Sequence, residues 1–334
     1  MVVSFREPDA TARAITSLLA QSATLVEVLV IDNDPDRSTA SASAAWKGDE
    51  RVRLIHSGSN LGYAAACNLA AAQAGGDWLF FLNPDAQADP DCIGLLLAAA
   101  DSRTGLVGAQ VLLPDGRTNA GDNPLHINGI AWAGRYGEPR ENGAVRRVAA
   151  VSGAALLART GAYRAIGGVC EWFFMYYEDT DLCWRMRLAG WEVRFCPEAV
   201  VWHDYRFDKG AAKWYRLERN RQWSVLSNYS ALSLMLLAPL LLGTELAVAA
   251  IAMRGAWVGE LVRAWGSTVR ALPELLKWRR RVQASRRARD SELLELMVAR
   301  FQTPLLDSPL VHRVNRLNVL YRAVLLRILR AVGR

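Results

Sequence analysis

Short apolar runs alternate with longer segments along the first hundred positions of this 334-residue chain. The runs VVSF, VEVLVID, VRLIH and WLFFLN, at 2–5, 26–32, 52–56 and 78–83, are typical of buried β-strands. A segment long enough for a crossover helix follows each run, at 10–20, 38–46, 62–74 and 90–100. Continuously apolar strands that alternate with helices predict an α/β fold with a mostly parallel sheet covered on both faces.

The pattern changes beyond residue 105. Apolar stretches at 105–116 and 147–159 predict β structure on either side of a Gly- and Asn-rich loop over 116–143. Two further short strands are predicted at 191–197 and 200–203, and a polar helix at 209–228. Ligands of parallel sheets bind beyond the carboxyl ends of the strands, so the polar residues there are the first candidates for chemistry.

The composition shifts at residue 229, which divides the chain into a predicted catalytic domain over 1–228 and a helical region over 229–334. Positions 222–244 carry no charge, and ALSLMLLAPLLLG at 231–243 is almost wholly apolar. A membrane-spanning helix needs about 20 apolar residues. Because Pro239 interrupts the run and Gly243 and Glu245 close it early, we expect an interfacial or re-entrant helix. A full span over 231–252 and a buried helix of a soluble unit stay open.

The last residues, 310–334, have the pattern of an amphipathic helix. One arc of the helical wheel is basic, with Arg313, Arg316, Arg327, Arg330 and Arg334. The opposite arc is apolar apart from Arg322, with Leu310, Val314, Leu317, Tyr321, Val324, Leu325 and Ile328. Such a helix binds anionic membrane surfaces, and the basic clusters KWRRR and RRAR at 277–281 and 286–289 add to the attraction. No recognition fold accompanies the charge, so no nucleic-acid partner is expected.

Charge separates the two regions as well. Residues 253–334 carry 17 Lys and Arg against 6 Asp and Glu, whereas the first 252 residues carry 23 against 27. A weakly acidic body with a basic tail indicates two kinds of task. The five cysteines form no CxxC pair, which argues against a thiolate zinc site and suits a reducing cytosol, and no signal peptide is expected.

Carboxylates follow two of the predicted strands. Asp32 closes the second strand and Asp85 follows the fourth, so both are expected at the carboxyl edge of the sheet. Asp32 can accept a hydrogen bond from a ribose or a pyrimidine N–H, and Asp85 can bind a divalent cation on a diphosphate. Ordinary turns would explain the same residues. His203, which ends VVWH, is a candidate metal ligand or a satisfied polar group.

The stretch YYEDTDLCWR at 176–185 places Glu178, Asp179 and Asp181 within four positions. Acids suit the positive end of a helix dipole, and Asp181 with Arg185 would form a surface ion pair, so a solvated first helical turn explains the cluster. The alternative is a catalytic base in an acidic pocket. The cluster alone does not decide between them.

Several motifs occur in an order that resembles family 2 glycosyltransferases of the GT-A fold, in particular bacterial rhamnosyltransferase-like members. These motifs are VVSF, VIDND, NLGYAAACN, FLNPDA, SGAALLAR, EWFFMYYEDTDLCWR and VVWH. The resemblance covers roughly residues 1–228. It implies a Rossmann-like catalytic domain and an inverting glycosyltransferase that depends on Mg²⁺ or Mn²⁺.

The resemblance also implies roles for individual residues on the donor side. Asp32 would contact the nucleotide base, with Asp34 close by. The nucleotide pocket would be lined by Ser4, Asn60, Gly62, Asn68 and Asn83. Arg216 and Arg219 would assist the diphosphate.

On the catalytic side, the resemblance implies that Asp85 and His203 hold the metal. Asp179 would be the catalytic base. Glu178 and Asp181 would support the acceptor or the start of the helix.

The chain departs from the family pattern at two places. SFR at 4–6 replaces the usual SYN, and GGVCE at 167–171 replaces GGFDE, so Cys170 stands where an acid is expected on the acceptor side. The alternative function is a non-catalytic nucleotide-binding scaffold of a polysaccharide-assembly complex, which would not need the carboxylates that this chain retains. A sugar-1-phosphate nucleotidyltransferase would need a Gly-rich phosphate loop, which FREPDATAR at 5–13 lacks.

The resemblance implies a dTDP- or UDP-linked sugar donor, with L-rhamnose from dTDP-rhamnose as the first choice. The implied acceptor is a polyprenyl-diphosphate-linked sugar in cell-surface polysaccharide synthesis. Together with the tail, this places the enzyme at the cytoplasmic face of the cell membrane as a peripheral or monotopic protein. Homo-oligomer formation is left open.

Overall fold

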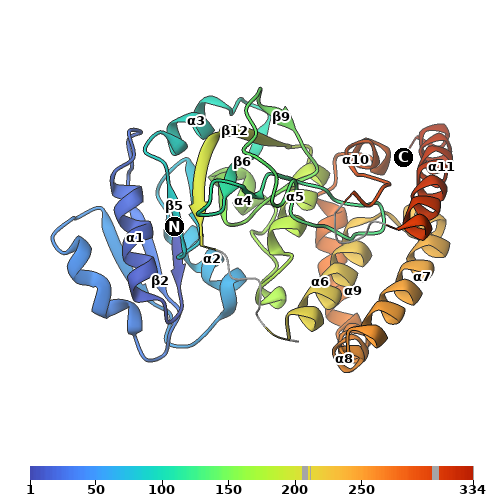
Figure 1. The fold of residues 1–334 in the computed structure, drawn as a ribbon, viewed down its shortest axis with the longest axis horizontal. Coiled ribbons are helices and arrows are strands. Elements are labelled where there is room, and N and C mark those ends of the chain that lie inside the picture. The colour runs from blue at the N-terminus through green and yellow to red at the C-terminus, as the bar shows by residue number, and fades with distance from the viewer. Residues whose placement is uncertain (205–209, 211, 303–307, 334) are drawn as a thin grey trace. The chain divides into compact units, whose positions relative to one another are not determined.

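The computed structural model describes residues 1–204, 210, 212–302 and 308–333, and only the backbone of 43–45 (Figure 1). The chain forms two compact units. The first comprises Met1–Asn123, Ala133–Met186 and Trp191–Phe207, and the second comprises Pro124–Trp132, Arg187–Gly190 and Asp208–Arg334. The polar helix predicted at 209–228 therefore belongs to the second unit. The boundary predicted after residue 228 assigns it to the first.

A mixed sheet forms the centre of the first unit, with the strand order β3-β2-β1-β4-β11-β6-β12-β5. Its strands are β1 (Val2–Ser4), β2 (Val28–Asp32), β3 (Val52–His56), β4 (Trp78–Leu82), β5 (Ala86–Ala88), β6 (Thr104–Leu112), β11 (Ala155–Arg159) and β12 (Glu192–His203). Strands β3, β2, β1 and β4 pair in parallel, and β6 is parallel to β12. β11 is antiparallel to both β4 and β6, and β5 is antiparallel to β12, so the other six strands have their carboxyl ends at one edge. The predicted mostly parallel sheet is confirmed.

Short strands extend this sheet at its periphery. β7 (Thr118–Ala120) pairs with β6 and β9 (Arg146–Arg147) pairs with β12, while β8 (Asp122–Asn123) and β10 (Ala150–Val151) form a separate ladder. Part of the predicted 116–143 loop is therefore strand.

Helices cover both faces of the sheet. They are α1 (Pro8–Leu19), the 3₁₀ helix η1 (Ser38–Trp46), α2 (Gly62–Gln73), α3 (Cys92–Ala98), α4 (Thr160–Ala165), η2 (Glu171–Phe173) and α5 (Glu178–Leu188). One core includes Ile15 of α1 and Leu96 of α3. The core on the other face includes Ala66 of α2 and Leu182 of α5.

Three local expectations differ from the structure. β3 is not buried, because it is an edge strand with one neighbour, and Leu54 is 38% exposed. The second crossover is the 3₁₀ helix η1 rather than an α-helix. The two short strands predicted around Pro197 are one strand, β12, because an irregularity between Cys196 and Val200 absorbs the proline within the ladder.

The second unit is helical. It contains α6 (Ala212–Asn228), α7 (Ala231–Arg254), α8 (Val258–Arg270), α9 (Leu272–Ala284), α10 (Asp290–Leu296) and α11 (Pro309–Ala331). α7 is continuous over its 24 residues, with Pro239 inside the helix. One face of α7, which includes Leu237 and Val248, is buried. In the part of the chain that the structure describes, α7 alone is long and apolar enough to cross a membrane.

Candidate active site

Polar residues meet at the carboxyl edge of the sheet, as the strand pattern predicts. Ser4 pairs with Asp32 across β1 and β2, and Asp32 pairs with His56 across β2 and β3. Asn83 follows β4, and His203 ends β12. This edge therefore collects residues that are distant in sequence.

Asp32 is buried and is held in place by hydroxyl and backbone groups. Its Oδ1 accepts hydrogen bonds from the Thr39 hydroxyl at 2.9 Å and from the Asp34 N–H at 3.3 Å. Oγ1 of Thr39 lies 2.8 Å from Oγ of Ser4, which links Ser4 to Asp32. Oδ2 is 3.8 Å from Nδ1 of His56, too far for a hydrogen bond. The contact of Asp32 with a nucleotide base stays a prediction.

Asp34 is also buried, and Nε of Arg6 lies 3.4 Å from its Oδ1. Burial acts to raise the pKa of Asp34, but hydrogen bonds from Ser38, Asp36 and Arg6 outweigh it and hold that pKa below its usual value. The unusual SFR sequence thus gives Asp34 a cationic partner.

Asn60 and Gly62 shape the turn that leads into α2. Oδ1 of Asn60 accepts hydrogen bonds from the Gly62 N–H at 3.0 Å and from Nδ2 of Asn33 at 3.1 Å. Gly62 has φ of +79°, and a Cβ there would lie 2.5 Å from the ring of Phe174. Only glycine fits this turn.

Asn68, on α2, uses its amide within the protein. Its Nδ2 donates to the Val169 carbonyl and to Oε1 of Glu171, each at 2.9 Å. Its Oδ1 accepts from the Tyr163 hydroxyl at 2.7 Å and from the Val169 N–H at 3.1 Å. These contacts hold the 167–171 loop, and the contact with a nucleotide stays a prediction.

The residues predicted to bind a metal lie together. Nε2 of His203 is 3.0 Å from Oδ1 of Asp85 and 3.5 Å from Nδ2 of Asn83, and its Nδ1 is 3.2 Å from Oδ1 of Asn119 on β7. An amide oxygen only accepts hydrogen bonds, so Nδ1 carries the hydrogen and Nε2 faces the Asp85 carboxylate. Nε2 of His203 and Oδ1 of Asp85 thus face one another at a distance that would let both bind one metal ion.

These side chains fit a divalent cation. Imidazole nitrogen and carboxylate oxygen both coordinate Mn²⁺, and the contact from Asn119 orients His203 as metal-binding histidines usually are. Within the described ranges, no three His, Cys, Asp or Glu side chains gather as a metal-binding group. An ion held by Asp85 and His203 would therefore take its remaining ligands from diphosphate oxygens and water.

The acidic cluster follows a loop with an unusual backbone. Phe174, Tyr176 and Tyr177 have φ of +66°, +69° and +71°. Such conformations cost about 1–3 kcal/mol each and gather at functional sites, where the surrounding structure maintains them. The loop presents Glu178 and Asp179 at the first turn of α5.

Asp179 is oriented by backbone groups. Its Oδ2 accepts from the Gly153 N–H at 2.8 Å, and its Oδ1 accepts from the Thr180 N–H at 2.6 Å. A Cβ on Gly153 would lie 2.9 Å from Cβ of Asp179, so this approach needs glycine. The next residue, Ala154, accepts from the Asn83 N–H at 3.0 Å. The start of β11 thus connects Asp179 with the segment that carries Asp85.

Glu178 and Asp179 have different surroundings. Oε2 of Glu178 is buried without a hydrogen bond to any described residue. Burial, and then the charge of Asp179, raise the pKa of Glu178 to about 8. Burial also raises the pKa of Asp179, against hydrogen bonds from Gly153 and Thr180. The hydrogen bonds from Gly153 and Thr180 favour the ionised form of Asp179, whereas Oε2 of Glu178 receives none from the described residues.

Asp181 pairs with Arg185, but the expected surface location is wrong. Nε of Arg185 lies 2.6 Å from Oδ2 of Asp181, and the two side chains are 2% and 0% exposed. Arg185 also donates to the Ile166 carbonyl at 3.2 Å. These contacts of Asp181 lie in the protein interior, and support of the acceptor stays a prediction.

Arg216 and Arg219 belong to α6 in the second unit. The Arg219 guanidinium packs over the rings of Tyr215 and Trp223, at 5.2 and 4.9 Å from their centres, and donates to Asn220 at 2.9 Å. The role of both arginines at a diphosphate stays a prediction.

Sequence reasoning missed the residues that orient the predicted ones. Gly153 lies in the SGAALLAR motif and could have been assigned from it, because a glycine before a strand often permits close approach. Thr39 and Asn119 carry no such signal, since they lie in segments predicted as a crossover helix and a loop.

Comparisons with known proteins agree with this geometry. A model of the family described as glycosyl transferase family 2 matches residues 1–166. The chain is 34% identical over 218 residues to a Mycobacterium tuberculosis protein named N-acetylglucosaminyl-diphospho-decaprenol L-rhamnosyltransferase. That match covers 57% of this chain and 70% of the relative.

Two solved structures share the fold at low sequence identity. TarS 1-349 from S. aureus in complex with UDP has a TM-score of 0.54 at 13% identity, over 100% of this chain and 91% of that one. GalNAc-T7 with UDP, GalNAc and Mn²⁺ has a TM-score of 0.57 at 14% identity, over 68% of this chain and 47% of that one. The chain thus spans about half of GalNAc-T7. The sheet, its polar carboxyl edge and the M. tuberculosis relative lead to one conclusion: the chain belongs to glycosyl transferase family 2, as a rhamnosyltransferase-like glycosyltransferase with the GT-A fold.

Proposed function

We propose that the chain catalyses the metal-dependent, inverting transfer of L-rhamnose from dTDP-rhamnose to a lipid-linked glycan. The observation that carries the proposal is that the neighbouring residues Gly153 and Ala154 bind Asp179 and the segment of the Asp85–His203 pair, the latter through the N–H of Asn83. The name of the M. tuberculosis relative supports both the sugar and the class of acceptor.

The proposed chemistry needs a base on the acceptor side. An acceptor hydroxyl attacks the anomeric carbon from the face opposite the leaving diphosphate, and the Asp179 carboxylate takes its proton. The N–H groups of Gly153 and Thr180 keep this carboxylate in one orientation. Glu178 keeps its own proton near neutral pH and adds no second charge.

On the donor side, Oδ2 of Asp32 is suited to accept the imide N–H of thymine or uracil. Both bases have this group, so the proposed contact serves a dTDP- or a UDP-linked donor. Thr39 holds Asp32 through its hydroxyl group, which also contacts the Ser4 hydroxyl, and the turn at Asn60 would line the nucleotide pocket beside them.

A divalent cation bound at Asp85 and His203 would supply neutralisation of the charge that develops on the leaving diphosphate. Asn119 fixes the His203 ring so that Nε2 faces this position. Arg216 and Arg219 are the proposed additional cations for the diphosphate.

The proposed acceptor is anchored in a membrane by its lipid. The apolar helix α7 and the basic helix α11 support association with the membrane. We place the enzyme at the cytoplasmic face, where nucleotide sugars are made.

The test is a panel of donors, dTDP-rhamnose, UDP-glucose, UDP-galactose and GDP-mannose, with Mg²⁺, Mn²⁺ or EDTA. We expect turnover of dTDP-rhamnose alone, loss of turnover in EDTA and its recovery with added Mn²⁺. Asp85→Asn should raise the Mn²⁺ concentration needed for half-maximal rate. Asp49→Asn, before β3 at the opposite edge of the sheet, is the matched control. Full turnover in EDTA, or preference for GDP-mannose, would contradict the proposal.

A further inference from the structure

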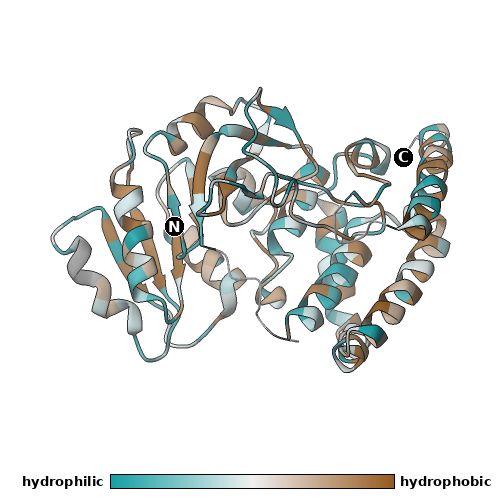
Figure 2. Ribbon diagram, viewed as in Figure 1, coloured by the Kyte–Doolittle hydropathy of each residue, from teal (hydrophilic) through white to brown (hydrophobic). Residues whose placement is uncertain are grey.

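α7 carries a stripe of exposed apolar side chains along most of its length. Met235, Leu242, Leu246 and Met253 are 67%, 66%, 75% and 66% exposed. Their spacing of seven, four and seven residues places them on one face of the helix. The stripe runs for about 27 Å at a rise of 1.5 Å per residue. Figure 2 shows α7 mainly in the brown of hydrophobic residues.

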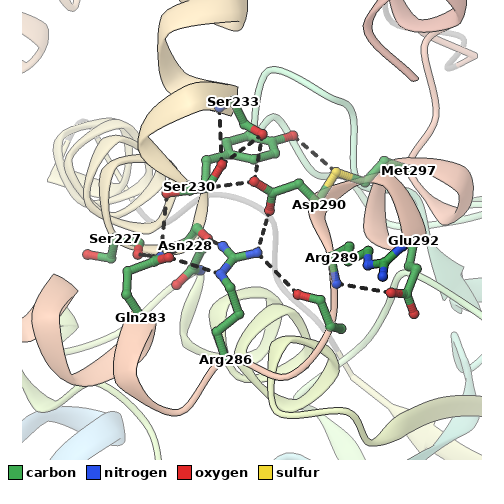
Figure 3. Close-up of polar contacts among 12 residues, drawn as sticks. Ser227, Asn228, Ser230, Ser233, Gln283, Arg286, Arg289, Asp290, Glu292 and Met297 are labelled. Atoms are coloured by element: carbon green, nitrogen blue, oxygen red, sulfur yellow. Dashed lines mark hydrogen bonds and ion pairs between the residues drawn. The ribbon is translucent and has the colours of Figure 1, made fainter. Parts of the chain in front are cut away.

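The opposite face of α7 is fixed to its own unit at the start of the helix. Oδ2 of Asp290 accepts from the Ser230 N–H at 2.9 Å and from the Ser233 hydroxyl at 2.6 Å (Figure 3). Nη1 of Arg286 lies 2.7 Å from Oδ1 of Asp290, and the Asp290 side chain is buried. Arg286 also donates to the carbonyl of Asn228, at the end of α6.

A second polar anchor lies near the middle of α7. Glu245 accepts from Arg221 of α6 and from Nε1 of Trp265 of α8, the latter at 2.7 Å. Arg221 is buried and also pairs with Glu218 at 2.8 Å. One turn of the helix therefore carries an ion pair directed into the unit.

These anchors limit how α7 can meet a bilayer. If α7 crossed the membrane, Glu245 would bring Arg221 and α6 to the middle of the hydrocarbon, where ionised groups are strongly disfavoured. A helix that lies in the interface keeps its polar face on the protein and places its apolar stripe against the acyl chains.

α11 provides a second apolar surface. Leu310, Leu317 and Leu320 are 69%, 66% and 63% exposed, while its face with Asn318 is buried against the unit. The hydroxyl of Tyr321 donates to the Leu236 carbonyl of α7. The exposed arc of α11 therefore borders α7.

The exposed charge of these helices is positive. α11 contains no acidic residue, and the one acid of α7, Glu245, is directed inward. Arg313, Arg316 and Arg327 form no ion pair with any residue that the structure describes. Anionic lipid headgroups complement this surface, whereas a second copy of the chain would bring like charges together.

We infer that the second unit binds anionic bilayers through the stripe of α7 and the arc of α11, and that α7 lies along the membrane surface instead of crossing it. The inference rests on the proposed function only in that the acceptor is carried by a lipid. It does not depend on the sugar, the metal or the base.

Flotation of the full chain with vesicles tests whether the stripe of α7 and the arc of α11 bind membranes. We expect binding to phosphatidylglycerol vesicles, little binding to phosphatidylcholine, and at least a tenfold loss of binding for Leu246→Glu. Val26→Glu, at a site 68% exposed in the first unit, is the matched control and should bind as wild type. Equal binding by Leu246→Glu, or no binding by wild type, would overturn the inference.

Depth measurement separates the two orientations of α7. The five native cysteines are buried, so single cysteines at Met235, Leu246 and Met253 can carry a fluorophore selectively. Quenching by lipids spin-labelled at known depths should place all three labels equally near the headgroup boundary. A deep label at Leu246 between shallow ones at Met235 and Met253 would show a spanning helix and overturn the inference.

Donor hydrolysis without vesicles distinguishes this inference from the proposed function. A chain that binds phosphatidylglycerol vesicles but hydrolyses no donor contradicts the proposed function alone. A chain that hydrolyses dTDP-rhamnose but does not bind vesicles contradicts the inferred membrane-binding surface alone.

Discussion

Glu178 and Asp179 are neighbours in the chain, yet their carboxyl groups meet different environments. Backbone N–H groups bind both oxygens of Asp179, whereas Oε2 of Glu178 is buried without a partner among the described residues. A general base must be ionised and oriented, and only Asp179 has the contacts for both. Glu178 has the surroundings of a carboxyl group that keeps its proton.

The raised pKa of Glu178 predicts a pH-dependent stability. Its folded pKa of about 8 lies above the usual 4.5, so the folded state holds a proton that the unfolded state loses between these values. Stability should therefore fall as pH rises from about 4.5 to 8 and then level off. Glu178→Gln removes this loss, so its gain in Tm over wild type should be larger at pH 8.5 than at pH 5.5.

Thermal unfolding at both pH values checks this prediction. Glu50→Gln, at an exposed turn before β3, is the control and should show the same Tm difference at both. A gain for Glu178→Gln that does not change with pH would show that Glu178 titrates normally.

Gly153 predicts a second effect at the scale of one residue. In Gly153→Ala, the new methyl group would lie 2.9 Å from Cβ of Asp179. This distance is too short, so the Asp179 side chain must move. We expect transfer to fall by about 10²-fold, in line with displacement of a positioned group by an ångström. The assay is the initial rate of transfer at saturating donor.

The control for Gly153→Ala is Gly161→Ala on α4, where no atom lies within 4 Å of the new Cβ. That variant should keep the wild-type rate. A wild-type rate in Gly153→Ala would mean that the orientation of Asp179 does not limit transfer.

At the scale of elements, apolar runs predicted the central strands because a parallel strand is buried on both faces whatever its neighbours are. The position of β3 at an edge depends on strand order, which periodicity does not encode. The continuity of β12 through Pro197 depends on a bulge next to β6. The sequence therefore predicted which segments are strands better than it predicted how exposed or continuous they are.

The candidate site likewise contains some residues that the sequence indicates and others that it does not. Asp32, Asp85, Asp179 and His203 could be chosen as candidates because they stand at strand or helix ends within recognisable motifs. Asn119 could not be found, because its contact with His203 arises only when β7 folds back on β6. A residue that orients a site residue from a distant segment can be found only from the tertiary structure.

α7 gives a prediction at the scale of one helix. Pro239 lacks an N–H and lies inside a continuous helix, so it removes one helical hydrogen bond. Pro239→Ala should raise the free energy of unfolding by about 1–3 kcal/mol. Urea denaturation followed by circular dichroism measures the change.

Ala250→Gly, at an exposed position of the same helix, should lower the free energy of unfolding by about 1 kcal/mol and shows that the assay senses α7. Unchanged or lower stability of Pro239→Ala would show that the proline is accommodated without cost.

At the scale of the whole molecule, the charge distribution in the sequence corresponds to two tasks. The first unit carries the sheet edge with its buried carboxylates, and the second carries the exposed apolar and cationic helices. We propose that the first unit performs the transfer while the second brings the enzyme to its lipid-linked acceptor.

The most direct measurement compares Asp179→Asn with wild type in transfer of L-rhamnose from dTDP-rhamnose to a lipid-linked acceptor, with donor binding followed by calorimetry. The asparagine keeps the shape of the side chain but cannot take a proton. We predict a loss of about 10²–10⁴-fold in transfer rate with donor affinity unchanged. Transfer near the wild-type rate would contradict the assignment of Asp179 as the base, and donor binding without transfer by wild type would favour a nucleotide-binding scaffold.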